Sequence, residues 1–204
     1  ISHKDMAIRF FRELSEIKTT IVLIGNHDRP NNKDWMSNLH PFMGIEEELD
    51  KSRNHITKEI ERLSKLGVSK DKLPILPPKN LYFISKPRVL RIQNKYPILF
   101  MPYVPPGRFI EAITEYIKYS HKSNKLAEIK GIKDFSLIFA HQEFKGVCYG
   151  PIASTKGDDW PDDYPLVISG HIHNRHFLKD NVFYTGSLYP ITMSESNDKG
   201  VIYG

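Results

Sequence analysis

Short apolar runs that end abruptly in polar residues mark the buried strands of this chain. Residues 21–24 run into Gly-Asn-His-Asp, residues 137–140 into a histidine, and residues 166–169 into Gly-His-Ile-His. Such runs, bounded by glycine or a polar side chain, are typical of a strand buried on both faces. Because open α/β sheets bind ligands at the carboxyl ends of their strands, we expect the polar residues to meet at one sheet edge. These residues are Asn26, His27, His141, His171 and His173.

Apolar residues recur at helical spacing in three other segments. The first segment opens with Ser2 as a candidate N-cap, and Asp5 follows at the third helical position. Met6, Phe10 and Leu14 then recur at i+4 spacing, which indicates an amphipathic helix. The predicted helices cover residues 2–17, 43–66 and 108–119.

Further short runs of apolar, β-branched and aromatic residues predict more strands. They cover residues 81–84, 89–92, 98–101, 182–185 and 201–203. Residues 142–165 instead carry several glycines, prolines and aspartates, which predicts a long irregular loop. Because this loop leaves one candidate ligand and returns just before two others, we expect it to run past the site. Strands interleaved with helices, followed by strand-rich sequence, indicate an α/β fold.

The polar cluster has the chemistry of a divalent metal site. Neutral imidazoles and a side-chain amide oxygen suit Mn, Fe or Zn, and Cys148 is the only cysteine, so no thiolate site competes. His171 and His173 are two residues apart. On a strand they would share a face, whereas on a tight turn they could splay toward two ions about 3.5 to 4 Å apart. We expect the turn.

These motifs, in this order, resemble those of the calcineurin-like metallophosphoesterases. The signature of that family is D-x-H, G-D-x-x-D, G-N-H-[DE], a single H and G-H-x-H. The last three stand here at residues 25–28, 141 and 170–173, and the first two are absent. The ending that runs from Gly186-Ser187 through Glu195 to Lys199-Gly200-Val201 is most similar to the SbcD-like branch of DNA-repair nucleases.

The resemblance implies a role for each motif residue. Asn26, His141 and His171 would bind the second metal ion, and His173 would bind the first. His27 would be the catalytic acid that meets the phosphodiester. The implied cofactors are two divalent ions, Mn in the first place, with Fe, Zn or Mg as alternatives. The remaining ligands would come from the two absent motifs.

The resemblance also implies a four-layer α-β-β-α fold, in which a two-sheet β-sandwich is flanked by helices. The chain opens on the helix that follows G-D-x-x-D in this family, and it has no initiator methionine. We therefore expect Ile1 to be an interior residue of a longer protein, with the first strand and helix missing from this chain. With 204 residues and 40% hydrophobic content, one domain over residues 1–204 is expected, with a helical, proline-rich insertion at 41–78.

Composition bounds the cellular setting only loosely. The sequence has no run of 18 apolar residues, so no membrane association is expected, and an intracellular protein, cytoplasmic or nuclear, is the default. A single cysteine excludes an internal disulfide, and we expect Cys148 to be structural. The formal charge of +5 is mildly favourable for a polyanionic partner and is also ordinary for a solvated surface.

Residues beside the motifs are candidates for substrate binding. Arg29 and Lys33 follow His27 and could line a groove for a phosphate backbone, or belong to a solvated loop. After His141, a second group could stack on or pair with a nucleic acid end, or could order the loop by aromatic packing. This group is Phe144, Lys145 and Tyr149. The histidines outside the motifs are expected to be surface or capping residues, namely His3, His40, His55, His121 and His176.

The resemblance implies metal-dependent phosphodiester hydrolysis on DNA, by an exo- or endonuclease subunit. The implied partners are DNA and an SbcC-type coiled-coil ATPase, with a homodimer as a further assembly to consider. Two alternatives stay open. One is a phosphatase or cyclic nucleotide phosphodiesterase with the same metal centre and a smaller substrate. The other is a non-catalytic scaffold that keeps the fold and binds protein partners.

Overall fold

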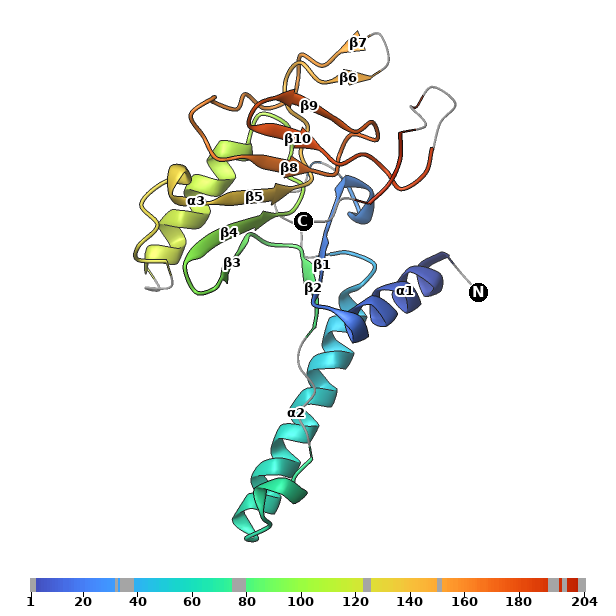
Figure 1. The fold of residues 1–204 in the computed structure, drawn as a ribbon, viewed down its shortest axis with the longest axis vertical. Helices are drawn as coiled ribbons and strands as arrows, with labels where there is room; N and C mark the ends of the chain where they lie inside the picture. Colours follow the sequence, from blue (N-terminus) through green and yellow to red (C-terminus); the bar gives the residue numbers. More distant parts are fainter. Residues whose placement is uncertain are drawn as a thin grey trace. The chain divides into compact units, whose positions relative to one another are not determined.

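The structure, a computed structural model, describes residues 3–31, 33, 39–74, 80–122, 126–149, 152–190, 195 and 198–201 (Figure 1). The chain divides into two compact units. The first unit comprises residues 1–22 and 39–83. The second comprises residues 23–38 and 84–204, and it contains every candidate site residue.

The first unit is built around two helices, α1 (His3–Ile17) and α2 (Met43–Lys65). Strands β1 (Thr20–Leu23) and β2 (Leu81–Ile84) form a two-stranded sheet. Aromatic rings fill the space between these elements. Phe11 of α1 meets Phe42 edge-on, with 5.6 Å between ring centroids, and Phe42 stacks on Phe83 of β2 at 5.1 Å. The helix is present as predicted, but its i+4 stripe is not buried: Met6, Phe10 and Leu14 are 60%, 50% and 38% exposed, and Phe11 beside them makes the aromatic contact instead.

The second unit is organised by a six-stranded sheet in the order β3-β4-β5-β8-β10-β9 (Figure 1). The four inner strands are parallel, and β3 and β9 run antiparallel at the two edges. The strands are β3 (Arg88–Ile92), β4 (Tyr96–Met101), β5 (Leu137–Ala140), β8 (Val167–Ser169), β9 (His176–Lys179) and β10 (Val182–Tyr184). A short hairpin, β6 (Cys148–Tyr149) and β7 (Ile152–Ala153), stands apart from this sheet.

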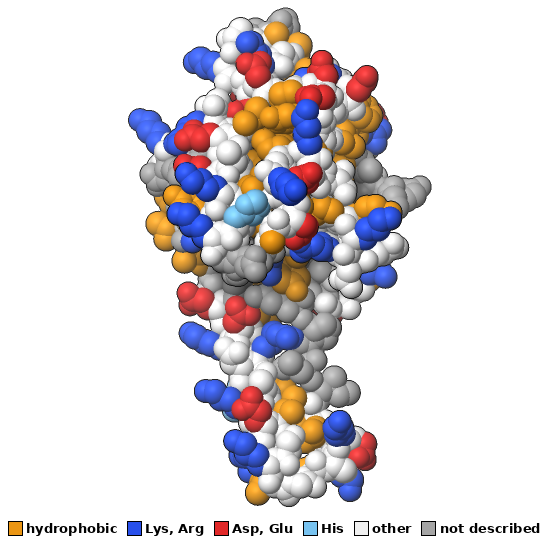
Figure 2. All heavy atoms as spheres, turned by 90° about the vertical axis from the view of Figure 1, so that its left-hand side faces the viewer, with side chains coloured by type: hydrophobic (Ala, Val, Ile, Leu, Met, Phe, Trp, Pro, Cys, Tyr) orange, Lys and Arg blue, Asp and Glu red, His pale blue; other side chains and the backbone are white. Residues whose placement is uncertain are grey.

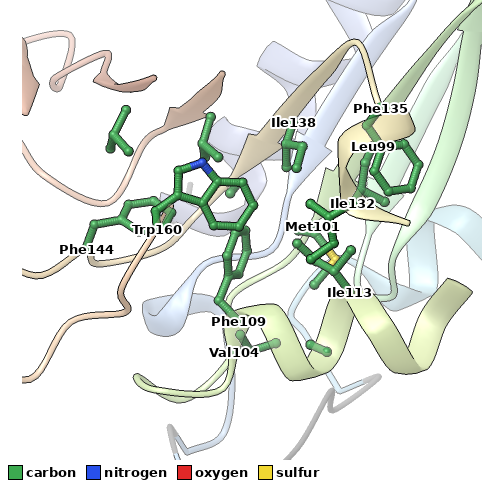
Figure 3. Close-up of a cluster of buried hydrophobic side chains, with 14 of the residues drawn as sticks. Leu99, Met101, Val104, Phe109, Ile113, Ile132, Phe135, Ile138, Phe144 and Trp160 are labelled. Atoms are coloured by element: carbon green, nitrogen blue, oxygen red, sulfur yellow. The ribbon is translucent and has the colours of Figure 1, made fainter. Parts of the chain in front are cut away.

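Helix α3 (Phe109–Lys122) packs on this sheet because its apolar residues recur every four positions. Phe109, Ile113 and Ile117 are all buried and join one core with side chains of β4 and β5. Figure 3 shows this core, in which Phe144 and Trp160 close one end.

Charged side chains of both signs are mixed on the face drawn in Figure 2. Lys and Arg side chains are spread over this face, with Asp and Glu side chains among them. No helix among the described residues is long and apolar enough to cross a membrane.

The helices and most strands confirm the sequence pattern. All three predicted helices are present with bounds within three residues of those expected, and so are the strands β1 to β5, β8 and β10. The edge strand β9 and the hairpin β6–β7 were not predicted, and the hairpin lies inside the segment expected to be irregular. Of the strand predicted at 201–203, only Val201 is described, and it is not in a strand.

One expectation about the sheet was wrong. Strand β1 is not a third strand of the sheet that holds β5 and β8, because it pairs with β2 in a sheet of its own. Its four residues are only half-buried, rather than covered on both faces. Ile24, the residue after β1, is buried and joins the β4 end, where its carbonyl accepts the Tyr103 N–H at 3.0 Å. This bond brings the Gly-Asn-His-Asp motif to the larger sheet.

Of the peripheral histidines, His40 is buried and His176 is half-buried. The His40 ring is buried and stacks on Phe83, with 6.0 Å between centroids. His176 begins β9, and its ring stacks on Tyr184 at 5.2 Å. His55 and His121 are exposed as expected. The side chain of His3 lies outside the described part of the chain.

The mixed α/β class is confirmed by the sheets and helices. The four-layer sandwich stays a prediction, as does the assignment of residues 41–78 as an insertion. Those residues fall within the first compact unit, together with α1.

The core of the second unit predicts the effect of one substitution. Ile113→Ala should lower the free energy of unfolding by about 2 to 5 kcal/mol, because a fully buried side chain leaves a cavity. Lys118→Ala, at an exposed position of the same helix, should change it by less than about 0.5 kcal/mol. Urea unfolding followed by circular dichroism measures both. Equal effects would contradict the packing of α3 on the sheet.

Candidate metal centre

The carboxyl ends of β5 and β8 bring two histidines together. The strands are parallel neighbours with Ala140 opposite Ser169, and the Gly170 N–H donates to the Ala140 carbonyl at 3.2 Å. His141 and His171 therefore leave the sheet at the same edge. Their rings meet edge to face, with 5.1 Å between centroids.

A buried hydroxyl locks these two strand ends. Ser169 Oγ donates to the Gln142 carbonyl at 2.8 Å and accepts the Gln142 N–H at 3.0 Å. It also lies 3.3 Å from the His171 N–H. The Gln142 side chain, fully buried, donates to Asp158 at 2.6 Å. Burial raises the pKa of Asp158, whereas its bonds to the Phe109 N–H and to Gln142 lower it.

The turn after Ile24 brings Asn26 to the same place. Residues Asn26–Asp28 form a single 3-10 turn, and the Asp28 carboxylate accepts the Gly25 N–H at 2.9 Å. Asn26 Oδ1 then lies 3.0 Å from His141 Nε2. Two adjacent ligands, each about 2.1 Å from a shared ion at right angles, are also about 3.0 Å apart. The spacing therefore suits a pair of ligands to one ion.

Gly25 is required by the closeness of the His141 ring. A Cβ at this position would lie 2.9 Å from His141 Nε2 and 3.0 Å from two ring carbons. Any side chain at residue 25 would thus push the imidazole away from Asn26. Gly25 of the Gly-Asn-His-Asp motif therefore sets the position of His141, which belongs to a different motif.

Burial keeps the two imidazoles neutral. It is the main cause that lowers the pKa of His141 to about 3, and repulsion from His171, His27 and His173 adds to it. Burial also lowers the pKa of His171, against the opposing effect of Glu143. At neutral pH both rings therefore have an unprotonated nitrogen, as a metal ligand must.

The His171 ring has one nitrogen that no protein group satisfies. Its Nε2 faces the Glu143 carboxylate at 3.7 Å, and its ring stacks on Tyr103, with 6.1 Å between centroids. Its Nδ1 is buried and has no hydrogen-bond partner within the described part of the chain. A divalent ion at Nδ1 would supply that partner, so the residues present fit a metal.

His27 and His173 complete the cluster. His27 is exposed on the 3-10 turn, and His173 lies in the bend 171–174, which confirms the turn expected for His-Ile-His. Both rings contribute to the low pKa values of His141 and His171, so their charges act on the same small region. The structure thus brings Asn26, His141 and His171 into contact and places His27 and His173 within electrostatic range of them. Their roles as ligands and acid stay predictions.

No three His, Cys, Asp or Glu side chains among the described residues converge closely enough to hold an ion by themselves. The cluster offers an amide oxygen and imidazoles without a bridging carboxylate.

Two of the residues proposed for substrate binding are buried. Arg29 is 8% exposed, and its guanidinium donates to the Tyr103 carbonyl at 2.9 Å, so it does not line a surface groove. Phe144 is 1% exposed and packs against Phe109 and Trp160, so it orders the loop instead of offering a stacking surface. Both assignments are corrected.

The other three candidates keep an open role. Lys33 is exposed, and its backbone N–H donates to Asn31 Oδ1 at 2.8 Å, which places it in a solvated loop. Lys145 is exposed, and its Nζ lies 3.6 Å from Asp159 Oδ1. The side chain of Tyr149 lies outside the described part.

Sequence reasoning missed the carboxylates behind the histidines. Glu143 faces His171, and Glu195 Oε1 lies 2.9 Å from His173 Nδ1. Glu195 belongs to the ending that was used only to choose a branch. Nothing in the local pattern around Glu143 signals its position, because it follows the His141 motif in a segment that reads as a loop.

Comparisons with known proteins identify two homologues of this chain. No family model matches the chain. The chain is 32% identical over 198 residues to "Putative phosphoesterase 244L" of Invertebrate iridescent virus 6, over 97% of this chain and 55% of that protein. It is 33% identical over 183 residues to "Putative phosphoesterase 078R" of Invertebrate iridescent virus 3, over 90% of this chain and 41% of that protein. The chain is homologous to both and spans about half their length.

The contact between Gly25 and His141 gives a test of the centre. Gly25→Ala should weaken metal affinity about tenfold or more, because the added methyl displaces the ring from Asn26. Gly44→Ala, where a Cβ would meet nothing within 4 Å, should leave affinity unchanged. Calorimetric titration of the full-length protein with Mn²⁺ measures both. Unchanged affinity in Gly25→Ala would show that His141 is not a ligand.

Proposed function

We propose that this chain carries part of the metal centre of a metal-dependent phosphoesterase that hydrolyses phosphodiesters in DNA. The observation that carries the proposal is the cluster of Asn26, His141 and His171, with neutral buried imidazoles and one buried ring nitrogen that no described protein group satisfies. The homologous viral proteins are named as phosphoesterases, which supports the reaction class.

The proposed ligands divide between two ions. Asn26, His141 and His171 serve the second ion, and His173 serves the first. Oxygen and imidazole donors favour Mn²⁺, with Fe, Zn or Mg as alternatives. When bound, the two ions would neutralise the phosphate and lower the pKa of the attacking water.

The residues of this chain contribute orientation and a proton. His27 is exposed and next to Asn26, so its ring can reach a phosphodiester held at the centre and donate a proton to the departing oxygen. Gly25 fixes the distance between the Asn26 oxygen and the His141 ring. Tyr103 stacks on the His171 ring and helps to orient it.

DNA is the substrate that we favour, with an SbcC-type ATPase as partner, because the ending at residues 186–201 resembles the repair-nuclease branch. A small-substrate phosphodiesterase is the second candidate. It is favoured by the burial of Arg29, which removes one of the two basic residues expected to line a groove for a phosphate backbone.

Substrate preference distinguishes a DNA nuclease from a small-substrate phosphodiesterase and from a non-catalytic scaffold. The full-length protein is given linear DNA or bis(4-nitrophenyl) phosphate at the same Mn²⁺ concentration, with a chelator as control. A nuclease should hydrolyse the DNA, and the chelator should abolish the activity. Hydrolysis of the aryl ester alone would favour the second candidate. Metal binding without either activity would favour a scaffold.

The roles of His27 and His141 predict different losses. In the full-length protein His27→Ala should retain both ions and lose about 10²-fold or more in kcat, because only proton transfer is removed. His141→Ala should lose the second ion together with the activity. Metal content by mass spectrometry and turnover are measured on the same samples. Equal metal loss in the two variants would make His27 a ligand.

Lys33 is the remaining basic residue beside the motif, and it tests the DNA proposal. If its ammonium contacts a phosphate, Lys33→Ala should reduce the slope of log affinity against log salt by about 0.9. Hydrolysis of the aryl ester should not change. Lys118→Ala, on the exposed face of α3, is the matched control. An unchanged slope would remove Lys33 from the DNA path.

A further inference from the structure

The ending at residues 195–199 is tied to the bend that carries His173. Glu195 Oε1 lies 2.9 Å from His173 Nδ1, and Lys199 Nζ donates to the His173 carbonyl at 2.6 Å. The guanidinium of Arg175 pairs with the Asp198 carboxylate. Three separate contacts thus join this ending to residues 173–175.

Each N–H donor of the Lys199 ammonium has a hydrogen-bond acceptor. It has three N–H donors, and three acceptors lie within reach: Glu195 Oε2 at 2.8 Å, the His173 carbonyl at 2.6 Å and Ser187 Oγ at 3.0 Å. The Lys199 and Glu195 side chains are each only 7% exposed. A buried ion pair is costly unless its groups are satisfied in this way. The carboxylate is therefore held in one position.

The backbone before Ser187 is shaped for this arrangement. Gly186 has a φ of +75°, and a Cβ there would lie 3.0 Å from the backbone nitrogen of Arg175 and 3.1 Å from the His173 carbonyl oxygen. The Ser187 N–H donates to that same carbonyl at 3.1 Å. Residues 173, 187 and 199 thus form one connected network around the carboxylate.

The network has a consequence for the His173 ring. An ionised carboxylate only accepts hydrogen bonds, so the ring nitrogen that faces Glu195 must carry hydrogen. The neutral ring then has its lone pair on Nε2. The His173 side chain is 42% exposed, whereas Glu195 is buried behind it, so the ring remains accessible to a ligand.

We propose that Glu195 is a positioning residue, held by Lys199 and Ser187, which fixes His173 as the Nδ1–H tautomer and leaves Nε2 to bind the first metal ion. The part that concerns the ion rests on the proposed function. Carboxylate partners of this kind orient metal-binding histidines, and their loss usually costs 10- to 100-fold in metal affinity.

The tautomer can be measured without metal. Long-range ¹H–¹⁵N NMR of this chain, with the His173 signals identified by their loss in His173→Gln, should show a single Nδ1–H tautomer. Glu195→Ala should allow both tautomers. Glu195→Gln keeps the size of the side chain, and its amide can accept or donate, so it should also lose the single tautomer. Thermal unfolding checks that each variant is folded.

Asp198→Asn is the matched control, because it weakens another tie of the same ending and does not touch the His173 ring. It should keep the Nδ1–H tautomer. In the full-length protein, Mn²⁺ affinity should fall 10- to 100-fold in Glu195→Ala and remain unchanged in Asp198→Asn.

Two results would overturn the proposal. One is a wild-type His173 ring protonated at Nε2, and the other is an unchanged tautomer in both Glu195 variants. Equal changes in Asp198→Asn would likewise assign the effect to the ending as a whole and refute a specific role of Glu195. If the full-length protein bound no Mn²⁺ while the NMR difference persisted, the metal centre would be refuted and the hold of Glu195 on His173 would stand.

Discussion

The site depends on the burial of neutral imidazoles at the end of two parallel strands. Strands β5 and β8 run in register, so His141 and His171 leave the sheet together, and Ser169 ties the two strand ends. Burial disfavours the protonated rings and lowers the pKa of His141 to about 3. Folding therefore keeps the His141 and His171 rings neutral, each with one unprotonated nitrogen, before any ion arrives.

This arrangement has a cost in stability. His171 Nδ1 is buried without a partner in the described part of the chain, and an unsatisfied buried polar atom costs about 1 to 3 kcal/mol. A protein can tolerate such an unsatisfied atom where a bound ligand supplies the missing partner. An ion bound by the folded protein and not by the unfolded chain would recover that free energy, so metal binding and stability are expected to be coupled at this position.

The sequence predicted the helices and strands better than it predicted which side chains point into the core. Apolar runs before His141 and Gly170 found β5 and β8, because buried parallel strands are nearly continuous in apolar residues. The same reasoning placed β1 in the wrong sheet. Its partner is β2, which lies some sixty residues further along the chain, and local sequence does not reveal so distant a pairing. Neighbours of the motifs were also misjudged. Arg29 and Phe144 follow motif residues, but packing against Tyr103 and Trp160 turns them inward, and local sequence does not encode that direction.

The bend at residues 171–174 would allow two histidines so close in sequence to serve the two proposed ions. Ile172, between them, is 3% exposed and anchored in the core, and because residues 171–174 form a bend and not a strand, the flanking rings need not share a face. Glu143 faces Nε2 of His171, whereas Glu195 faces Nδ1 of His173. The two rings therefore present opposite nitrogens, Nδ1 and Nε2. Two carboxylates placed behind one tripeptide would in this way direct one ligand to each of two ions about 3.5 to 4 Å apart.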